Sequence, residues 1–286
     1  MDGTLLDEKV EITKRASEAI LRAQDAGIEF AVATGRTVGS GYSLVKEHGI
    51  TCPFIELNGA RYFDENEALQ YTRDMNKKDV KTLIQILDHY DVTNEFITQK
   101  GAYSKQTLDN YIQTFKSVFK NINKEMTEEE SREYAIGRMK HFNMNTVDNY
   151  NFLYEDAETQ VLKTLAHAHD DLPLLNELKT TIENELPEVI VTSASTFTLE
   201  VNHISANKGR AVADLATQRG YTADEVITIG DNINDLTMLQ WATHSYAVSN
   251  AHTLAKEAAA YIAPSHADYA VAQIIERVLD GKSLQF

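Results

Sequence analysis

The stretch that decides the fold runs from Val226 to Asp235 and reads Val-Ile-Thr-Ile-Gly-Asp-Asn-Ile-Asn-Asp. Its first four residues are β-branched, which is typical of a buried strand, and Gly230 follows them. Two carboxylates and two amides complete the stretch, and oxygen ligands of this kind suit Mg²⁺. Because ligands of open parallel sheets bind beyond the carboxyl ends of the strands, the stretch predicts a strand that leads into a binding loop.

Helices and strands alternate along both ends of the chain. Before residue 60 we expect a helix between Thr13 and Gly27, a strand at 28–33, a helix at 42–48, a strand at 53–57 and a hairpin turn at Asn58-Gly59. After residue 200 we expect helices at 208–218, 235–241, 253–259 and 269–279, and strands at 226–230, 245–248 and 261–262. This alternation predicts an α/β core with a Rossmann-like doubly wound parallel sheet.

The middle of the chain has a different pattern. Long polar helices are expected at 78–89, 108–119 and 174–186, and separated strands at 92–98, 160–167 and 189–192. Helices mixed with separated strands are typical of an α+β domain with its own sheet. We therefore predict a discontinuous core, residues 1–76 plus 196–286, with an α+β cap domain inserted at 77–195.

Composition excludes several classes of function. The 286 residues include 27 Lys+Arg and 43 Asp+Glu, a formal net charge of −16. This balance argues against binding to nucleic acid, because a phosphate backbone is bound by clustered basic side chains. One cysteine, Cys52, excludes a disulfide framework, and no apolar run has the length of a membrane span. We expect a cytoplasmic protein that is a monomer or a weak homodimer and that binds neither nucleic acid nor membranes.

Three further polar clusters accompany the binding loop. Asp2-Gly3-Thr4 lies at the start, Thr34-Gly35-Arg36 directly follows an expected strand, and Asn207-Lys208-Gly209 opens an expected helix. A lysine at a helix N-terminus favours an anion, as do the hydroxyl and main-chain N–H groups of a loop after a strand. Taken singly, each cluster is equally compatible with an ordinary turn, loop or helix start.

Taken together and in this order, the clusters resemble the motifs of haloacid-dehalogenase-superfamily phosphatases of the Cof type, which carry a large α/β cap. The residues that carry the resemblance are Asp2-Gly3-Thr4-Leu5-Leu6, Thr34-Gly35-Arg36, Asn58-Gly59-Ala60, Lys208-Gly209 and Gly230-Asp231-x-x-Asn234-Asp235. The resemblance covers the whole chain. It implies Mg²⁺-dependent hydrolysis of a small phosphorylated metabolite, such as a sugar phosphate or a phosphorylated cofactor, through an aspartyl-phosphate.

The resemblance also implies roles for individual residues. Asp2 would be the general acid/base, with its main-chain carbonyl facing the metal, and Lys208 would contact both the phosphate and the nucleophile. The implied phosphate-binding residues are Thr34, Gly35, Lys208 and Asn234. The implied metal-site residues are Asp2, Asp231 and, behind the direct ligands, Asp235. Candidate substrate contacts are Arg36, Asn58 and Gly59.

The first motif departs from the family pattern. That pattern reads Asp-x-Asp-Gly-Thr, its first Asp is the nucleophile at the end of a central strand, and Met1 stands at the x position here. Without that strand its two neighbours would have unpaired edges inside the sheet. We therefore expect a short apolar segment, ending in the nucleophilic Asp, just upstream of Met1. The alternative is a non-catalytic phosphometabolite-binding or regulatory protein of the same fold that lacks the nucleophile.

Other interpretations of the sequence are weaker. The glycine-rich stretch from Gly35 to Gly41 lacks the Gly-Lys-Ser/Thr of a P-loop and the glycine spacing of a dinucleotide site. The run from His167 to Asp171 is compatible with a transition-metal site, although a polar strand end leading into a capped helix explains it as well. Nothing between residues 77 and 195 identifies the substrate.

Overall fold

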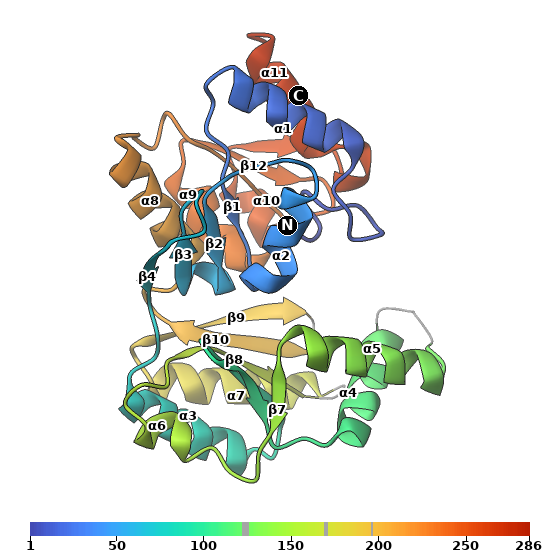
Figure 1. Cartoon of the computed structure of the whole chain (residues 1–286), viewed down its shortest axis with the longest axis vertical. Helices are drawn as coiled ribbons and strands as arrows, with labels where there is room; N and C mark the ends of the chain where they lie inside the picture. Colours follow the sequence, from blue (N-terminus) through green and yellow to red (C-terminus); the bar gives the residue numbers. More distant parts are fainter. Residues whose placement is uncertain (122–125, 169–170, 196) are drawn as a thin grey trace. The chain divides into compact units, whose positions relative to one another are not determined.

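The computed structural model describes residues 1–121, 126–168, 171–195 and 197–286, and these form two compact units (Figure 1). The core unit comprises Met1–Thr72 and Ala206–Phe286, and the insert unit comprises Arg73–Ser205. The boundaries between the units lie after Thr72 and Ser205, whereas the sequence predicted them after residues 76 and 195. Thr198–His203 forms a strand of the insert sheet, and Met75 forms a β-bridge with Val161, so both flanks belong to the insert unit.

The core unit contains two sheets. The first has the order β1-β2-β3-β4, with β1 and β2 parallel and the remaining pairs antiparallel, and the second has the parallel order β11-β12-β13. The strands are β1 (Val32–Ala33), β2 (Phe54–Glu56), β3 (Arg61–Phe63), β4 (Leu69–Thr72), β11 (Ile227–Gly230), β12 (His244–Val248) and β13 (Tyr261–Ala263). The antiparallel β2–β3 pair confirms the hairpin predicted at Asn58-Gly59, where Asn58 has a φ of 63° and Gly59 a φ of 100°.

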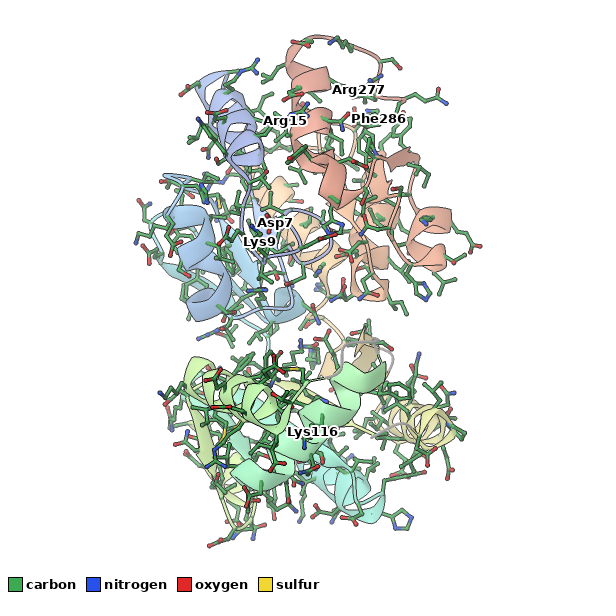
Figure 2. The ribbon with its side chains drawn as sticks, turned by 90° about the vertical axis from the view of Figure 1, so that its right-hand side faces the viewer. Asp7, Lys9, Arg15, Lys116, Arg277 and Phe286 are labelled. Carbon is green, nitrogen blue, oxygen red and sulfur yellow. The ribbon has the colours of Figure 1, made fainter. Side chains whose placement is uncertain are left out.

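Helices pack around both sheets of the core unit. They are α1 (Lys14–Asp25), α2 (Val38–Lys46), α8 (Lys208–Arg219), α9 (Leu236–Trp241), α10 (Thr253–Ala258) and α11 (Ala270–Leu279), with short 3₁₀ turns η1 (Leu57–Gly59), η2 (Ile233–Asp235) and η3 (His266–Asp268). Figure 2 shows α1, with Arg15, beside α11, with Arg277. Arg15 forms two hydrogen bonds, of 3.1 and 2.6 Å, to the carboxylate of Glu276 and so ties the two helices together.

The strand predicted at 28–33 is present only at Val32–Ala33. In the part of the chain that the structure describes, β1 pairs with a strand on one edge because it ends its sheet, and β11 likewise ends the other sheet. A largely apolar cavity of about 500 Å³ lies along both strands and is lined by residues of α1, α8, α9 and α11 as well, with Met1 and Leu5 among its other walls. The predicted strand is short because, among the described residues, no strand pairs with the main-chain groups before Val32.

The insert unit is built on a six-stranded sheet of order β7-β6-β5-β8-β10-β9, antiparallel except for β6 and β7. Its strands are β5 (Thr93–Thr98), β6 (Gly101–Ser104), β7 (Met144–Thr146), β8 (Val161–His167), β9 (Val189–Ser195) and β10 (Thr198–His203). Its helices are α3 (Lys77–His89), α4 (Leu108–Asn121), α5 (Glu128–His141), α6 (Phe152–Glu155) and α7 (Leu172–Glu185). Apolar residues of α3, α7 and this sheet form one buried cluster, which is the core of the unit.

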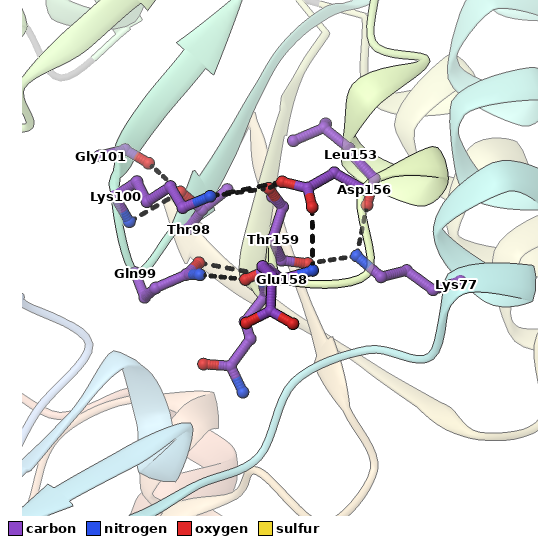
Figure 3. Close-up of polar contacts among 10 residues, drawn as sticks. Lys77, Thr98, Gln99, Lys100, Gly101, Leu153, Asp156, Glu158 and Thr159 are labelled. Atoms are coloured by element: carbon purple, nitrogen blue, oxygen red, sulfur yellow. Dashed lines mark hydrogen bonds and ion pairs between the residues drawn. The ribbon is translucent and has the colours of Figure 1, made fainter.

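A polar network fixes the loop between α6 and β8 (Figure 3). The ammonium of Lys77 donates a 2.9 Å hydrogen bond to the carbonyl oxygen of Leu153 and another to that of Thr159. Asp156 accepts a 2.6 Å hydrogen bond from the hydroxyl of Thr159 and lies 3.3 Å from the ammonium of Lys100. The network satisfies main-chain oxygens of the loop and so holds α3, the loop and the β5–β6 hairpin together.

A second charged cluster lies on the sheet of the insert unit. The carboxylate of Glu95 is fully buried, 2.8 Å from the guanidinium of Arg138 and 3.6 Å from the ring of His167. Burial alone would raise the pKa of Glu95, but Arg138 and His167 outweigh it and lower the pKa to about 2. His167 also contacts the hydroxyl of Thr198 at 3.0 Å, so its side chain is held within the sheet.

No helix among the described residues combines the length and the apolar character needed to cross a bilayer.

Candidate active site

Four chain segments of the core unit meet at the carboxyl ends of β1, β2 and β11. Thr34 follows β1, Asn58 follows β2, Asp231 follows β11 and Lys208 begins α8. The main chain links the first two loops, because the amide of Asn58 donates to the carbonyl oxygen of Thr34 at 2.9 Å. Gly35 lies between Thr34 and Arg36 in the first of these loops, and the hydroxyl of Thr34 accepts a 3.1 Å hydrogen bond from the amide of Arg36.

A buried ion pair joins α8 to the loop after β11. The ammonium of Lys208 lies 2.6 Å from Asp235, and both side chains are about 5% exposed or less. The second oxygen of Asp235 accepts hydrogen bonds from the amides of Asp231 and Asn232, at 2.9 and 3.0 Å. Burial alone would raise the pKa of Asp235, but Lys208 and the amide of Asp231 outweigh burial and hold the pKa below its ordinary value. Asp235 is therefore a fixed anion that positions Lys208.

Asp231 is held on its other side by the N-terminal segment. The hydroxyl of Thr4 donates a 2.5 Å hydrogen bond to Asp231, and a Cβ at Gly3 would lie 2.5 Å from the same carboxylate. Gly3 also has a φ of 65°, a left-handed backbone conformation that favours glycine. Burial raises the pKa of Asp231, and the nearby charge of Asp235 raises it further.

Asp2 forms a bidentate pair with Arg36. The guanidinium donates two hydrogen bonds to the carboxylate, at 2.7 and 2.5 Å, and a third, at 3.1 Å, to the carbonyl oxygen of Ser40. Burial opposes ionisation of Asp2, but these hydrogen bonds outweigh it and lower the pKa of Asp2. In this arrangement Asp2 is a carboxylate without a proton to donate.

The remaining predicted site residues also contact one another. The side chain of Asn234 donates a 3.1 Å hydrogen bond to that of Asn58. A Cβ at Gly59 would lie 2.8 Å from the carbonyl oxygen of Asn207, so the turn after β2 packs directly on the start of α8. The structure thus brings the predicted residues into two contacting groups, Asp2 with Arg36 and Thr34, and Asp231 with Asp235 and Lys208, bridged by the Asn58–Asn234 contact.

Sequence reasoning missed three residues that support the site. Asn250 donates a 2.8 Å hydrogen bond to the carbonyl oxygen of Gly3, and the hydroxyl of Thr237 accepts one of 2.9 Å from the amide of Gly209. Ser40 supplies the carbonyl oxygen that holds Arg36. Asn250 lies just after β12, and its place beyond a strand end was a usable signal, whereas Thr237 and Ser40 lie in helices with no distinguishing pattern.

The donor set at this site is compatible with Mg²⁺. Among the described residues no three His, Cys, Asp or Glu side chains are grouped as ligands of one metal ion. However, Mg²⁺ in proteins commonly uses one or two carboxylates and keeps several waters. Asp231 and Asp235 bring two carboxylates close together, and burial makes their mutual repulsion costly. A divalent cation beside Asp231 would relieve that repulsion.

The run from His167 to Asp171 has structural roles where it is described. His167 pairs with Glu95, and Asp171 caps α7 by accepting a 2.9 Å hydrogen bond from the amide of Leu174. The other two polar residues of the run, His169 and Asp170, lie outside the described residues.

Residues 1–275 match the family model described as haloacid dehalogenase-like hydrolase. Similar proteins include the Bacillus subtilis 5-amino-6-(5-phospho-D-ribitylamino)uracil phosphatase YwtE, with 26% identity over 99% of this chain and 97% of that protein. They also include the Escherichia coli pyridoxal phosphate phosphatase YbhA, with 23% identity over 96% and 95%.

Solved structures show the same fold. A haloacid dehalogenase-like hydrolase from Bacillus subtilis superimposes with a TM-score of 0.81, covering 97% of each chain at 24% identity. This likeness agrees with the Rossmann-like α/β core and inserted α+β unit predicted from the sequence. Because the family model spans almost the whole sequence, the chain belongs to the haloacid dehalogenase-like hydrolases.

Proposed function

We propose that this chain is a phosphatase that hydrolyses a small phosphorylated metabolite in an Mg²⁺-dependent reaction. Family membership and relatives that are phosphatases support its assignment as a phosphoric monoester hydrolase. The observation that carries the proposal is the buried Lys208–Asp235 pair beside Asp231 and the Asp2-Gly3-Thr4 segment. It combines a fixed cation with a carboxylate pair, which is the charge pattern needed to bind a phosphate dianion together with a divalent cation.

The reaction proceeds through two displacements at phosphorus. In the first, the carboxylate of an Asp just upstream of Met1 forms a bond to phosphorus while the bond to the leaving oxygen breaks, and Asp2 gives that oxygen a proton. In the second, Asp2 accepts a proton from water, the water oxygen bonds to phosphorus, and the bond to the nucleophilic Asp breaks. Inorganic phosphate and the dephosphorylated metabolite are the products.

The chain's own residues hold the phosphate during both steps. Lys208 neutralises charge on the phosphate oxygens, and Thr34, the amide of Gly35 and Asn234 donate hydrogen bonds to them. Asp231 would ligate Mg²⁺ together with the main-chain carbonyl of Asp2, with Asp235 behind them. Bound there, Mg²⁺ supplies electrostatic stabilisation of the transferring phosphoryl group.

Asp2 can act as an acid only after its pair with Arg36 opens. The bidentate contact stabilises the carboxylate form of Asp2, so proton donation requires Arg36 to move to another anion. The substrate phosphate is such an anion, and Asn58 and Gly59 lie in the neighbouring loop as candidate substrate contacts. In this proposal the insert unit serves as a cap that excludes water and selects the leaving group.

The named relatives support the proposed substrate class. One acts on a phosphorylated ribitylaminouracil and another on pyridoxal phosphate, both of them small phosphorylated molecules. We propose a substrate of that size, a sugar phosphate or a phosphorylated cofactor, in the cytoplasm.

The test compares three proteins in an assay of p-nitrophenyl phosphate hydrolysis with and without Mg²⁺. They are this chain, the chain with five apolar residues and an Asp joined ahead of Met1, and the same extension ending in Asn. We expect Mg²⁺-dependent turnover only with the Asp extension, because only that protein has the nucleophile. Binding of phosphorylated metabolites without turnover by any of the three would contradict the proposal and favour the non-catalytic alternative.

A further inference from the structure

The loop after β12, residues 249–252, contacts both chain segments of the proposed metal site. The side chain of Asn250 donates a 2.8 Å hydrogen bond to the carbonyl oxygen of Gly3. Two residues further on, the amide of His252 donates a 2.8 Å hydrogen bond to the carbonyl oxygen of Asp231. One short loop therefore holds the main chain of the N-terminal segment and the main chain of the loop after β11 at the same time.

A third contact closes these hydrogen bonds into a ring. The hydroxyl of Thr4, the residue after Gly3, donates a 2.5 Å hydrogen bond to the carboxylate of Asp231. Asp231 is thus held through its side chain by the N-terminal segment and through its main chain by the 249–252 loop. Because the ring is closed, the N-terminal segment can shift relative to Asp231 only if one of these hydrogen bonds breaks.

The turn after β13 fixes the direction in which the side-chain amide of Asn250 points. The oxygen of this amide accepts a 3.0 Å hydrogen bond from the amide of His266 and a 3.2 Å hydrogen bond from the hydroxyl of Ser265. A main-chain N–H can only donate and a carbonyl oxygen can only accept, so the amide oxygen must face His266 and the NH₂ group must face Gly3. Asn250 is exposed, yet three hydrogen bonds hold its side chain in one orientation.

We propose that Asn250 is a positioning residue for the metal site and acts by fixing the direction of the Gly3 carbonyl. Gly3 has a φ of 65°, and glycine without a restraint reaches several backbone conformations. Rotation at Gly3 would turn the carbonyl oxygen of Asp2, the residue before it, relative to the carboxylate of Asp231. The inference rests on the proposed function, which assigns both of these groups to Mg²⁺. Residues that hold metal ligands in place from behind commonly change metal affinity by about 10–100-fold.

The first experiment compares Asn250→Ala with Ser249→Ala in the whole chain. Both residues are exposed and lie on the same loop, so the Ser249 variant controls for a substitution at that place. By isothermal titration calorimetry we expect Asn250→Ala to bind Mg²⁺ about tenfold more weakly than the parent chain, and Ser249→Ala to bind it as the parent does. The two variants should have similar thermal midpoints by circular dichroism, because both substitutions are at the surface. If the parent chain binds Mg²⁺ and the two variants bind it equally well, the inference is overturned.

The second experiment measures the N-terminal segment itself, without metal. The amides of residues 4–6 donate hydrogen bonds of 2.9–3.3 Å to the carbonyl oxygen of Met1, so their hydrogen exchange reports opening of the turn that contains Gly3. Loss of one restraining hydrogen bond should speed this exchange by about fivefold in Asn250→Ala. Exchange in that variant no faster than in Ser249→Ala would overturn the inference.

A third variant, Asn250→Asp, separates hydrogen-bond donation from side-chain size. Its carboxylate keeps an oxygen for the amide of His266 but has no N–H to donate to Gly3. Exchange at residues 4–6 should therefore rise as it does in Asn250→Ala, although Asp and Asn have nearly the same size. Exchange as slow as in the parent chain would mean that donation to Gly3 is not what holds the segment, and the inference would fail.

Failure of this inference and failure of the proposed function give different results. If neither the parent chain nor any variant binds Mg²⁺, the result counts against the proposed function, and the exchange measurement alone decides whether Asn250 restrains Gly3. If the parent binds Mg²⁺ and Asn250→Ala binds it equally well, the proposed function stands and the inference fails. Weaker Mg²⁺ binding together with faster exchange in Asn250→Ala supports both.

Discussion

The Lys208→Met variant is expected to have a free energy of unfolding about 3–5 kcal/mol lower than that of the parent chain. Lys208 is buried and lies 2.6 Å from buried Asp235, so removing the ammonium leaves a carboxylate without its counter-charge. Asp235 cannot turn to solvent, because its second oxygen accepts hydrogen bonds from the amides of Asp231 and Asn232. Urea denaturation measured by the fluorescence of Trp241, which lies on α9 of the core unit and is the one tryptophan of the sequence, reports this change.

The control for Lys208 is the double variant Lys208→Met with Asp235→Asn. The side-chain amide of Asn at position 235 keeps an oxygen for the amides of Asp231 and Asn232 and removes the unpaired negative charge. The double variant should therefore have a higher free energy of unfolding than Lys208→Met alone. In the protein with the Asp extension, Lys208→Met should also lower kcat by about 10²–10³, the usual effect of losing one charge-stabilising donor. A Lys208→Met variant as stable and as active as its parent would contradict the assigned role of the ion pair.

Gly209→Ala is expected to cost about 3 kcal/mol of stability or more, at the upper end of overpacking effects. A Cβ at Gly209 would overlap the main-chain carbonyl of Thr237, where the start of α8 packs on α9. Backbone cannot move aside as a flexible side chain can, so the two helices must separate, and Lys208 would move with α8. Thermal unfolding followed by circular dichroism and by Trp241 fluorescence measures the loss.

The control for Gly209 is Gly137→Ala in α5. A Cβ at Gly137 would meet no heavy atom within 4 Å, so the substitution should stabilise the helix by about 0.5–1 kcal/mol. If both substitutions have the same small effect, the close approach of α8 and α9 is not what requires glycine at position 209.

Local patterns predicted the parts of the fold that depend on local chemistry. The β-branched run before Gly230 forms β11, and the Asn58-Gly59 turn forms the β2–β3 hairpin. β10 (Thr198–His203) was not predicted, because its place in the sheet depends on its partners β8 and β9. Its sequence also shows no turn that would mark it off from the predicted domain boundary. The acidic residues at 128–130 form the first turn of α5. Thr127 followed by Glu130 three residues later is a capping pattern that the sequence contained, and in the structure the two residues form the reciprocal hydrogen bonds of a capping box.

The site was predictable in composition but not in its contacts. The residues were named from their motifs, whereas the Asp2–Arg36 pair joins positions 34 apart in the sequence and the Thr4–Asp231 hydrogen bond joins positions 227 apart. Such contacts depend on how the strands are ordered in the sheets, which periodicity does not encode. The shortened β1 has the same origin, since strand length depends on the neighbour that is available as well as on the residues themselves.

The most direct test of the account is the mass of the intact protein during turnover. In the chain with the Asp extension, Asp2→Asn should slow hydrolysis of the phosphoenzyme, because no base is left to activate water. Formation of the phosphoenzyme should continue, because p-nitrophenyl phosphate has a good leaving group that needs little help from an acid. After acid quenching we predict a protein heavier by one phosphoryl group, attached to the added Asp and released by hydroxylamine. The account would be contradicted if the chain with the Asp extension turned over substrate but its Asp2→Asn variant showed no phosphorylated protein. It would also be contradicted if the chain with the Asn extension gained the same mass.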